Sequence, residues 1–173
     1  LARAARRGFR DDCSGFVSEV YSAVGVPMDG TVASIHELAV VHDALYWDEE
    51  PHVGDLVFFD DTWDRNGNGL HDDPLTHIAL VLDVEPDGRL LLGHAGTSSG
   101  RTTTWMDLTD PTVNRNTHGE VRNAYLREPK SGDRGIPYLT GELWAGFARV
   151  GDDADWLTHA YIQSPLDPAV RFP

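Results

Sequence analysis

The sequence predicts an α+β domain in which N-terminal helices pack on a small antiparallel sheet. The chain has 173 residues, which suits one domain with a hydrophobic core of its own. Apolar residues recur at helical spacing before Pro51, and after it they form short runs of the length of buried strands. Helices followed by a run of strands are typical of α+β domains rather than of alternating α/β folds.

Two helices are expected before Pro51. The first is predicted over residues 13–24, because Asp12 is a natural N-cap and Gly25 ends the apolar pattern. The second is predicted over residues 32–46 on the same spacing. The apolar positions are Phe16, Val17, Val20, Tyr21 and Val24 in the first helix and Ile35, Leu38, Ala39 and Leu45 in the second.

Short apolar runs after Pro51 predict the strands of the sheet. The five predicted strands cover residues 55–59, 76–84, 89–94, 102–106 and 146–150. The second and third are expected to pair as a hairpin, because the turn sequence Glu85-Pro-Asp-Gly88 separates them. The sheet is therefore expected to be antiparallel.

The chain divides into a basic N-terminal segment (1–10), a domain (11–150) with an insertion at 60–75, and a C-terminal tail (151–173). Residues 107–141 are rich in Pro, Gly, Asn and Arg, and we expect long loops there. The tail contains a possible short helix at 156–161 before its proline-rich end.

Charge and composition exclude several classes of protein. The formal net charge of −14 repels phosphate backbones, which argues against nucleic-acid binding. The longest apolar runs, such as residues 78–82, are too short to cross a bilayer, and no segment has the pattern of a signal peptide. The chain starts at Leu1 rather than Met, so an upstream targeting segment can have been removed, and the compartment is not readable from the sequence.

Cys13 is the only cysteine, so no intrachain disulfide is possible, and a lone cysteine is more often a buried small side chain than a catalyst. Its predicted place in the first turn of a helix lowers the pKa of the thiol through unpaired N–H groups and the helix dipole. The neighbouring Asp11 and Asp12 raise it, so a nearby imidazolium is expected to hold the thiolate.

Two of the eight histidines are placed to act on this thiol. His77 opens an apolar strand, at the rim of the predicted sheet, where its ring can face a helix end. His94 closes the next strand, and a hairpin would bring it close to His77. A nucleophile, a base and a group that orients the base would then come from one helix and two adjacent strands.

Four segments carry a resemblance to a known family. They are Asp12-Cys-Ser-Gly-Phe-Val17, Pro51-His-Val-Gly-Asp-Leu-Val-Phe-Phe59, Thr76-His-Ile-Ala-Leu-Val81 and Gly93-His-Ala-Gly96. In this order they resemble the nucleophile motif, the first sheet strand, the base motif and the third-residue strand of the NlpC-like cysteine peptidases of bacterial cell walls. The resemblance covers roughly residues 11–106, and 146–150 resembles the closing strand, whereas 60–75 and 107–145 have no counterpart.

The resemblance implies a papain-like fold and a cysteine hydrolase with Cys13, His77 and His94 as its catalytic groups. Asp12 and Ser14 are then expected to help bind the substrate, although a plain N-cap is an equally good reading of Asp12. Family members typically cut the bond between γ-D-glutamate and a diamino acid in peptidoglycan stem peptides. The resemblance further implies a periplasmic or extracellular location and, for a toxin against rival cells, an immunity or inhibitor protein as a partner.

The insertion contains a possible calcium loop. Its candidate ligands at the alternating spacing of an EF-hand loop are Asp64, Asn66, Asn68, Leu70 through its carbonyl, and Asp72. Asp73, or Asp60 or Asp61 from the strand end, could take the place of the twelfth ligand. The bidentate Glu of an EF-hand is missing at Leu75, and a polar turn without metal is the alternative. Zinc through His71 is disfavoured because the surrounding ligands are hard oxygens. Bound Ca²⁺ would be structural, supporting the strand that starts at His77.

Two other functions are kept open. An N-acetylmuramoyl-L-alanine amidase would use the same catalytic groups on the bond between sugar and peptide. A calcium-stabilised, non-catalytic cell-wall-binding module would keep the fold without activity, and its Cys13 would react like an ordinary thiol. An acyltransferase on a permuted fold is disfavoured, since its histidine would precede its cysteine.

Overall fold

The structure is a computed structural model and describes residues 8–48, 50–96, 100–127 and 135–151. Its helices are α1 (Cys13–Ala23) and α2 (Val32–Val41). Its strands are β1 (Leu45–Tyr46), β2 (Leu56–Phe59), β3 (His77–Val84), β4 (Leu90–Gly96), β5 (Gly100–Met106) and β6 (Trp144–Ala148). The five predicted strands are confirmed with shifts of one or two residues at most of their ends, and β1 was not predicted.

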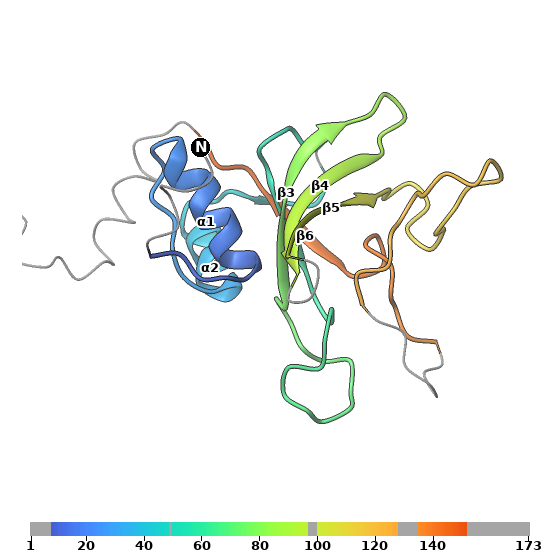
Figure 1. The fold of residues 1–173 in the computed structure, drawn as a ribbon, viewed down its shortest axis with the longest axis horizontal. Helices are drawn as coiled ribbons and strands as arrows, with labels where there is room; N and C mark the ends of the chain where they lie inside the picture. The colour runs from blue at the N-terminus through green and yellow to red at the C-terminus, as the bar shows by residue number, and fades with distance from the viewer. Residues whose placement is uncertain (1–7, 49, 97–99, 128–134, 152–173) are drawn as a thin grey trace, which may run out of the picture.

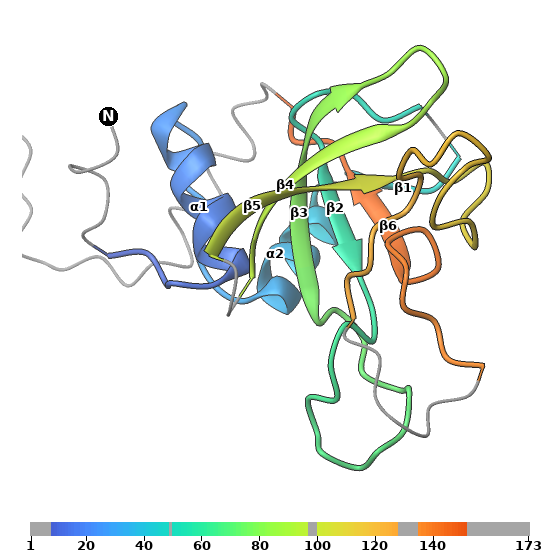
Figure 2. The same cartoon turned by 45° about the vertical axis from the view of Figure 1, so that its right-hand side comes forward.

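The six strands form one antiparallel sheet in the order β1-β6-β2-β3-β4-β5. Both helices lie on one side of it, and the described parts of the connection between β5 and β6 lie on the other (Figure 1). The predicted α+β class and the predicted hairpin of β3 and β4 are therefore confirmed. Turned by 45°, Figure 2 shows the 60–75 segment as a loop that projects beyond the ends of β2 and β3.

Successive side chains of β2 point to opposite faces of the sheet, and the core therefore has two layers. Leu56 and Phe58 point to the helix side, where they pack with α1 and α2. Val57 and Phe59 point to the opposite side, where they pack with β4, β5 and side chains of the long connection such as Leu143. All four β2 side chains have no solvent exposure, which explains why this strand reads as a continuous apolar run.

The second helix is shorter than predicted, and the expectation that it continues to residue 46 is wrong. It ends at Val41, and Asp43 adopts a left-handed conformation with φ of 51°. The chain then turns so that Leu45 and Tyr46 pair with β6. Asp tolerates this conformation better than most residues, which allows the chain to leave the helix here. The helical spacing of Leu45 was misleading because Leu45 pairs with a distant strand instead.

Long loops were predicted over residues 107–141. The described parts of this range contain two isolated bridges, Arg115 with Val121 and Tyr125 with Leu139, and neither helix nor longer strand. The possible helix at 156–161 lies outside the described residues. Among the helices that the structure describes, none is long and apolar enough to span a membrane.

Candidate active site

Cys13 is the first residue of α1, and the cap of that helix fixes its position. Oδ1 of Asp12 accepts hydrogen bonds from the Gly15 backbone N–H at 2.9 Å and from the Ser14 hydroxyl at 2.7 Å. Oδ2 accepts one from Nε of Arg10, also at 2.7 Å. Asp12 is therefore the N-cap of α1, and Cys13 lies among the N–H groups that a helix start leaves without intrahelical partners.

Gly15 is required by a close approach of the backbone. A Cβ atom at this position would lie 1.8 Å from the carbonyl oxygen of Arg10, because the chain folds back across the first turn of α1. Only glycine fits such a contact. The Asp-Cys-Ser-Gly sequence thus has a local explanation: a cap, a thiol at the helix start, and space for the preceding segment.

His77 and His94 are in contact. His77 opens β3, where it pairs with Phe59, and His94 follows Gly93 on β4, which pairs with Leu80. Nε2 of His77 lies 2.9 Å from Nδ1 of His94, and the two rings meet edge to face at 83°. The expectation that the hairpin brings the two histidines together is confirmed.

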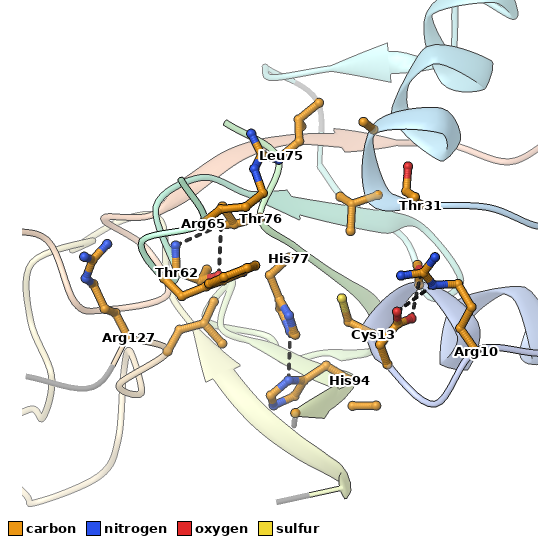
Figure 3. A pocket seen from close by; sticks show the side chains of 18 of the residues that line it. Arg10, Cys13, Thr31, Thr62, Arg65, Leu75, Thr76, His77, His94 and Arg127 are labelled. Atoms are coloured by element: carbon orange, nitrogen blue, oxygen red, sulfur yellow. Dashed lines mark hydrogen bonds and ion pairs between the residues drawn. The ribbon is translucent and has the colours of Figure 1, made fainter. Parts of the chain in front are cut away.

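The Cys13 sulfur points towards the His77 ring, as Figure 3 shows. The start of α1 and the first residues of β3 are close, since the two elements are in contact and the backbone of Ile78 is near enough to act on the Cys13 thiol. Thiol, first imidazole and second imidazole thus follow one another from α1 through β3 to β4. This is the spatial order that a nucleophile, its base and an orienting group require.

Burial decides the resting protonation states. It lowers the pKa of His77 to about 3, with a further lowering from His94 and an opposing effect of Asp12. Burial also lowers the pKa of His94. It raises the pKa of the Cys13 thiol, to which the Asp12 carboxylate adds. These directions favour a neutral thiol beside two neutral rings over the expected pair of thiolate and imidazolium.

The hydrogen bond between the two rings indicates which nitrogen can act as a base. For Nδ1 of His77 to accept a proton, the ring's own hydrogen must lie on Nε2, from which it is donated to Nδ1 of His94. His94 then carries its hydrogen on Nε2. In this tautomer His77 presents an unprotonated nitrogen in a ring whose orientation is fixed by its neighbour.

These three groups line a cleft of about 970 Å³. The predicted substrate-binding residues Asp12 and Ser14 also line it, and their role in binding stays a prediction. Among the other residues that line it are Trp63 and Arg65 from the 60–75 insertion, and Tyr125 and Arg127 from the long connection, two segments outside the family resemblance. Sequence patterns had not indicated these four, because they lie in segments without periodicity.

The predicted calcium loop is closed by its own hydrogen bonds. Asp64 accepts from the backbone N–H groups of Gly67 and Gly69, at 2.7 and 2.9 Å. The side-chain oxygens of Asn66 and Asn68 accept from the N–H groups two residues further on, the second of which belongs to Leu70. These contacts explain the sharp turn without requiring a metal.

The last two candidate ligands differ from each other. Asp72 accepts hydrogen bonds from the side-chain amides of Asn66 and Asn68, whereas the buried Asp73 accepts from the Arg65 backbone N–H at 2.9 Å. Among the described residues, no three His, Cys, Asp or Glu side chains are grouped to hold a metal ion. Asn and backbone oxygens supply half of the predicted ligands, so the calcium site stays a prediction.

Asn123 is a structural residue that the sequence did not reveal. It is fully buried, and its side-chain amide donates to the carbonyl oxygens of Asp107, Asp110 and Val113 at 2.9 to 3.1 Å. Its Oδ1 accepts from the Asp107 backbone N–H at 2.8 Å. Asn123 therefore holds together the connection that delivers Arg127 to the cleft.

Searches of protein families, curated proteins and solved structures find no match to this chain. The resemblance to NlpC-like peptidases therefore depends on the four quoted motifs, and the papain-like arrangement stays a prediction. What the structure establishes is an α+β fold with a thiol and two buried histidines on one cleft.

Proposed function

We propose that this protein is a cysteine hydrolase that cleaves peptidoglycan stem peptides, at the bond between γ-D-glutamate and the diamino acid. The observation that carries the proposal is the shared cleft of Cys13, His77 and His94, in which the two rings are 2.9 Å apart. A histidine whose second nitrogen is held by a hydrogen bond meets the requirement of a general base that is oriented by a third group.

In the proposed mechanism, the Cys13 thiol transfers its proton to Nδ1 of His77 as its sulfur attacks the scissile carbonyl carbon. The tetrahedral intermediate collapses as the C–N bond breaks, and His77 gives the proton to the leaving amine. Water then attacks the thioester, loses a proton to His77 and releases the acid, after which Cys13 regains its proton. His94 orients His77 and accepts a hydrogen bond from the imidazolium in both steps.

Two features of the resting site favour proton transfer that is concerted with attack. The raised pKa of the Cys13 thiol and the lowered pKa of His77 both disfavour an ion pair before the substrate binds. The N–H groups at the start of α1 stabilise negative charge that develops near Cys13. The Cys13 backbone N–H, which has no partner within the helix, is the predicted oxyanion donor.

The test is digestion of purified peptidoglycan, with mass spectrometry of the soluble fragments. The proposal predicts fragments with a new amine on the diamino acid from the natural chain, none from Cys13→Ser, and full activity from His118→Leu, an exposed histidine in the long connection. Cleavage between muramic acid and L-alanine would indicate the amidase instead. Release of no fragment from any peptidoglycan, with Cys13 intact and the protein folded, would contradict both.

A further inference from the structure

Arg127 is a buried cation with no carboxylate partner among the residues that the structure describes. Its side chain lines the cleft and only 7% of the residue is exposed. Among the residues that the structure describes, no carboxylate pairs with it; its one side-chain hydrogen bond goes from Nη1 to the carbonyl oxygen of Asp61. A guanidinium has five N–H donors, so most of the donors of Arg127 have no partner among the described residues.

The other two arginines of the cleft are different. Nε of Arg10 lies 2.7 Å from the Asp12 carboxylate, and Nε of Arg65 lies 3.8 Å from that of Asp73. Burying a charge without a counter-ion is costly, and this chain has 28 acidic residues that could supply one. The lack of a paired carboxylate in the described part of the chain around Arg127 therefore points to an anion that arrives with the ligand.

Arg127 is also held in place before a ligand binds. The bond from Nη1 to the Asp61 carbonyl oxygen fixes the guanidinium, and the backbone N–H groups of Leu126 and Arg127 donate to the Tyr138 carbonyl oxygen at 2.9 and 3.3 Å. A donor that is fixed in advance loses little conformational entropy on binding. Figure 3 shows Arg127 and Arg10 on opposite sides of His77 and Cys13, so these cations lie at separate ends of the cleft.

The chemistry of the guanidinium selects the ligand group. Its planar fork matches a carboxylate in a two-bond arrangement and discriminates against a carboxamide, which brings its own donors and no charge. A γ-linked glutamate leaves its α-carboxylate free, and a diamino acid has a free carboxylate as well. The net charge of −14 does not attract anions from a distance, so the contact must be local.

We propose that Arg127 is a specificity residue that binds a free carboxylate of the stem peptide and makes the site prefer acidic over amidated peptides. This inference rests on the proposed function for the identity of the peptide. The binding of a peptide carboxylate at Arg127 does not require that the peptide is cleaved, so the two can be tested apart.

The experiment measures how well two peptides protect Cys13 from iodoacetamide in the full chain. The probes are L-alanyl-γ-D-glutamyl-diaminopimelate and the same peptide with its carboxylates converted to amides. For the natural chain, the acid is expected to protect at about 10- to 100-fold lower concentration than the amide, as a charge-assisted hydrogen-bonded pair would give. Arg127→Gln should remove this preference, and Arg127→Lys should retain part of it.

Arg10→Gln is the matched control, because it removes the same charge from the other end of the cleft and should leave the preference in place. An equal loss of the preference for the acidic peptide in Arg10→Gln and Arg127→Gln would show that the preference comes from the overall charge of the cleft, and this would overturn the inference. Equal protection by acid and amide, or no protection by either, would overturn it as well. If the acidic peptide protects Cys13 through Arg127 but no peptidoglycan is cleaved, the inference stands and the proposed function fails. If both peptides are cleaved at equal rates, the proposed function stands and the inference fails.

Discussion

Replacing His94 by leucine tests the role assigned to the buried histidine pair. The substitution removes the acceptor of the His77 Nε2 hydrogen bond, which is 2.9 Å long, and keeps an apolar side chain of similar size in a position that is only 8% exposed. The His77 hydrogen then moves to Nδ1, where it can find another partner, and the nitrogen that must take the thiol proton is blocked. His94→Leu therefore reduces the fraction of His77 in the productive tautomer and frees its ring to rotate.

The magnitude follows from the lost hydrogen bond. A buried donor left without its acceptor costs about 1–3 kcal/mol. If that energy is needed to restore the productive tautomer in the transition state, kcat falls by about 10- to 100-fold, since about 1.4 kcal/mol corresponds to a factor of ten. KM should change little, because His94 acts through His77 rather than on the substrate.

The assay is steady-state hydrolysis of a stem peptide by His94→Leu and by His94→Asn. The asparagine offers a side-chain oxygen to the same Nε2 hydrogen, so it should recover most of the lost kcat. His118→Leu is the control for loss of a histidine in itself, and thermal melting controls for folding. Wild-type kcat in His94→Leu, or no recovery in His94→Asn with both variants folded, would refute the reasoning.

Protonation, loop anchoring and metal binding give three further predictions. His77 has a pKa of about 3 in the folded protein against 6.5 unfolded, so its stabilisation is present above pH 6.5 and is lost as the pH falls towards 3. Between pH 7 and 5, urea denaturation should show that the free energy of unfolding of the natural chain falls by about 2 kcal/mol and that of His77→Gln does not. The same fall in both proteins would reject the lowered pKa of His77. Asn123→Ala should lower the free energy of unfolding by about 3 kcal/mol, from three or four lost hydrogen bonds, and a change below about 1 kcal/mol would remove its anchoring role. If Ca²⁺ binds residues 64–73, EGTA should lower the melting temperature of the natural chain and not that of Asp64→Ala; no effect of EGTA rejects the calcium site.

Local signals explain why the helix start and the central strands were predictable. The Asp12 cap and Gly25 bracket α1, and the structure ends that helix within one residue of the predicted bound. The apolar run of β2 is buried on both faces, which a sequence reveals directly. By contrast, β1 was missed because its two residues become a strand only by pairing with β6, about 100 positions later, and pairing of that kind leaves no local pattern.

The candidate site was also predictable only where local signals exist. Cys13, His77 and His94 could be brought together from the sequence, since a capped helix and one hairpin determine where they lie. Their resting charge could not, because the shift of the His77 pKa comes from burial that only the packed structure defines. Arg127 had no sequence signal, as an arginine in an aperiodic loop is ordinarily exposed, and its burial depends on Asp61 and the surrounding connection.

The central claim is that Cys13 forms a covalent bond to its substrate, and intact-protein mass spectrometry of a rapidly quenched reaction tests it most directly. After mixing with a stem peptide and quenching in acid, the protein should gain the mass of the acyl fragment, and peptide mapping should place it on Cys13. Cys13→Ser quenched in the same way should show no thioester that hydroxylamine releases. Turnover of the peptide by a Cys13→Ala variant that folds normally, or an adduct mapped to another residue, would contradict the account.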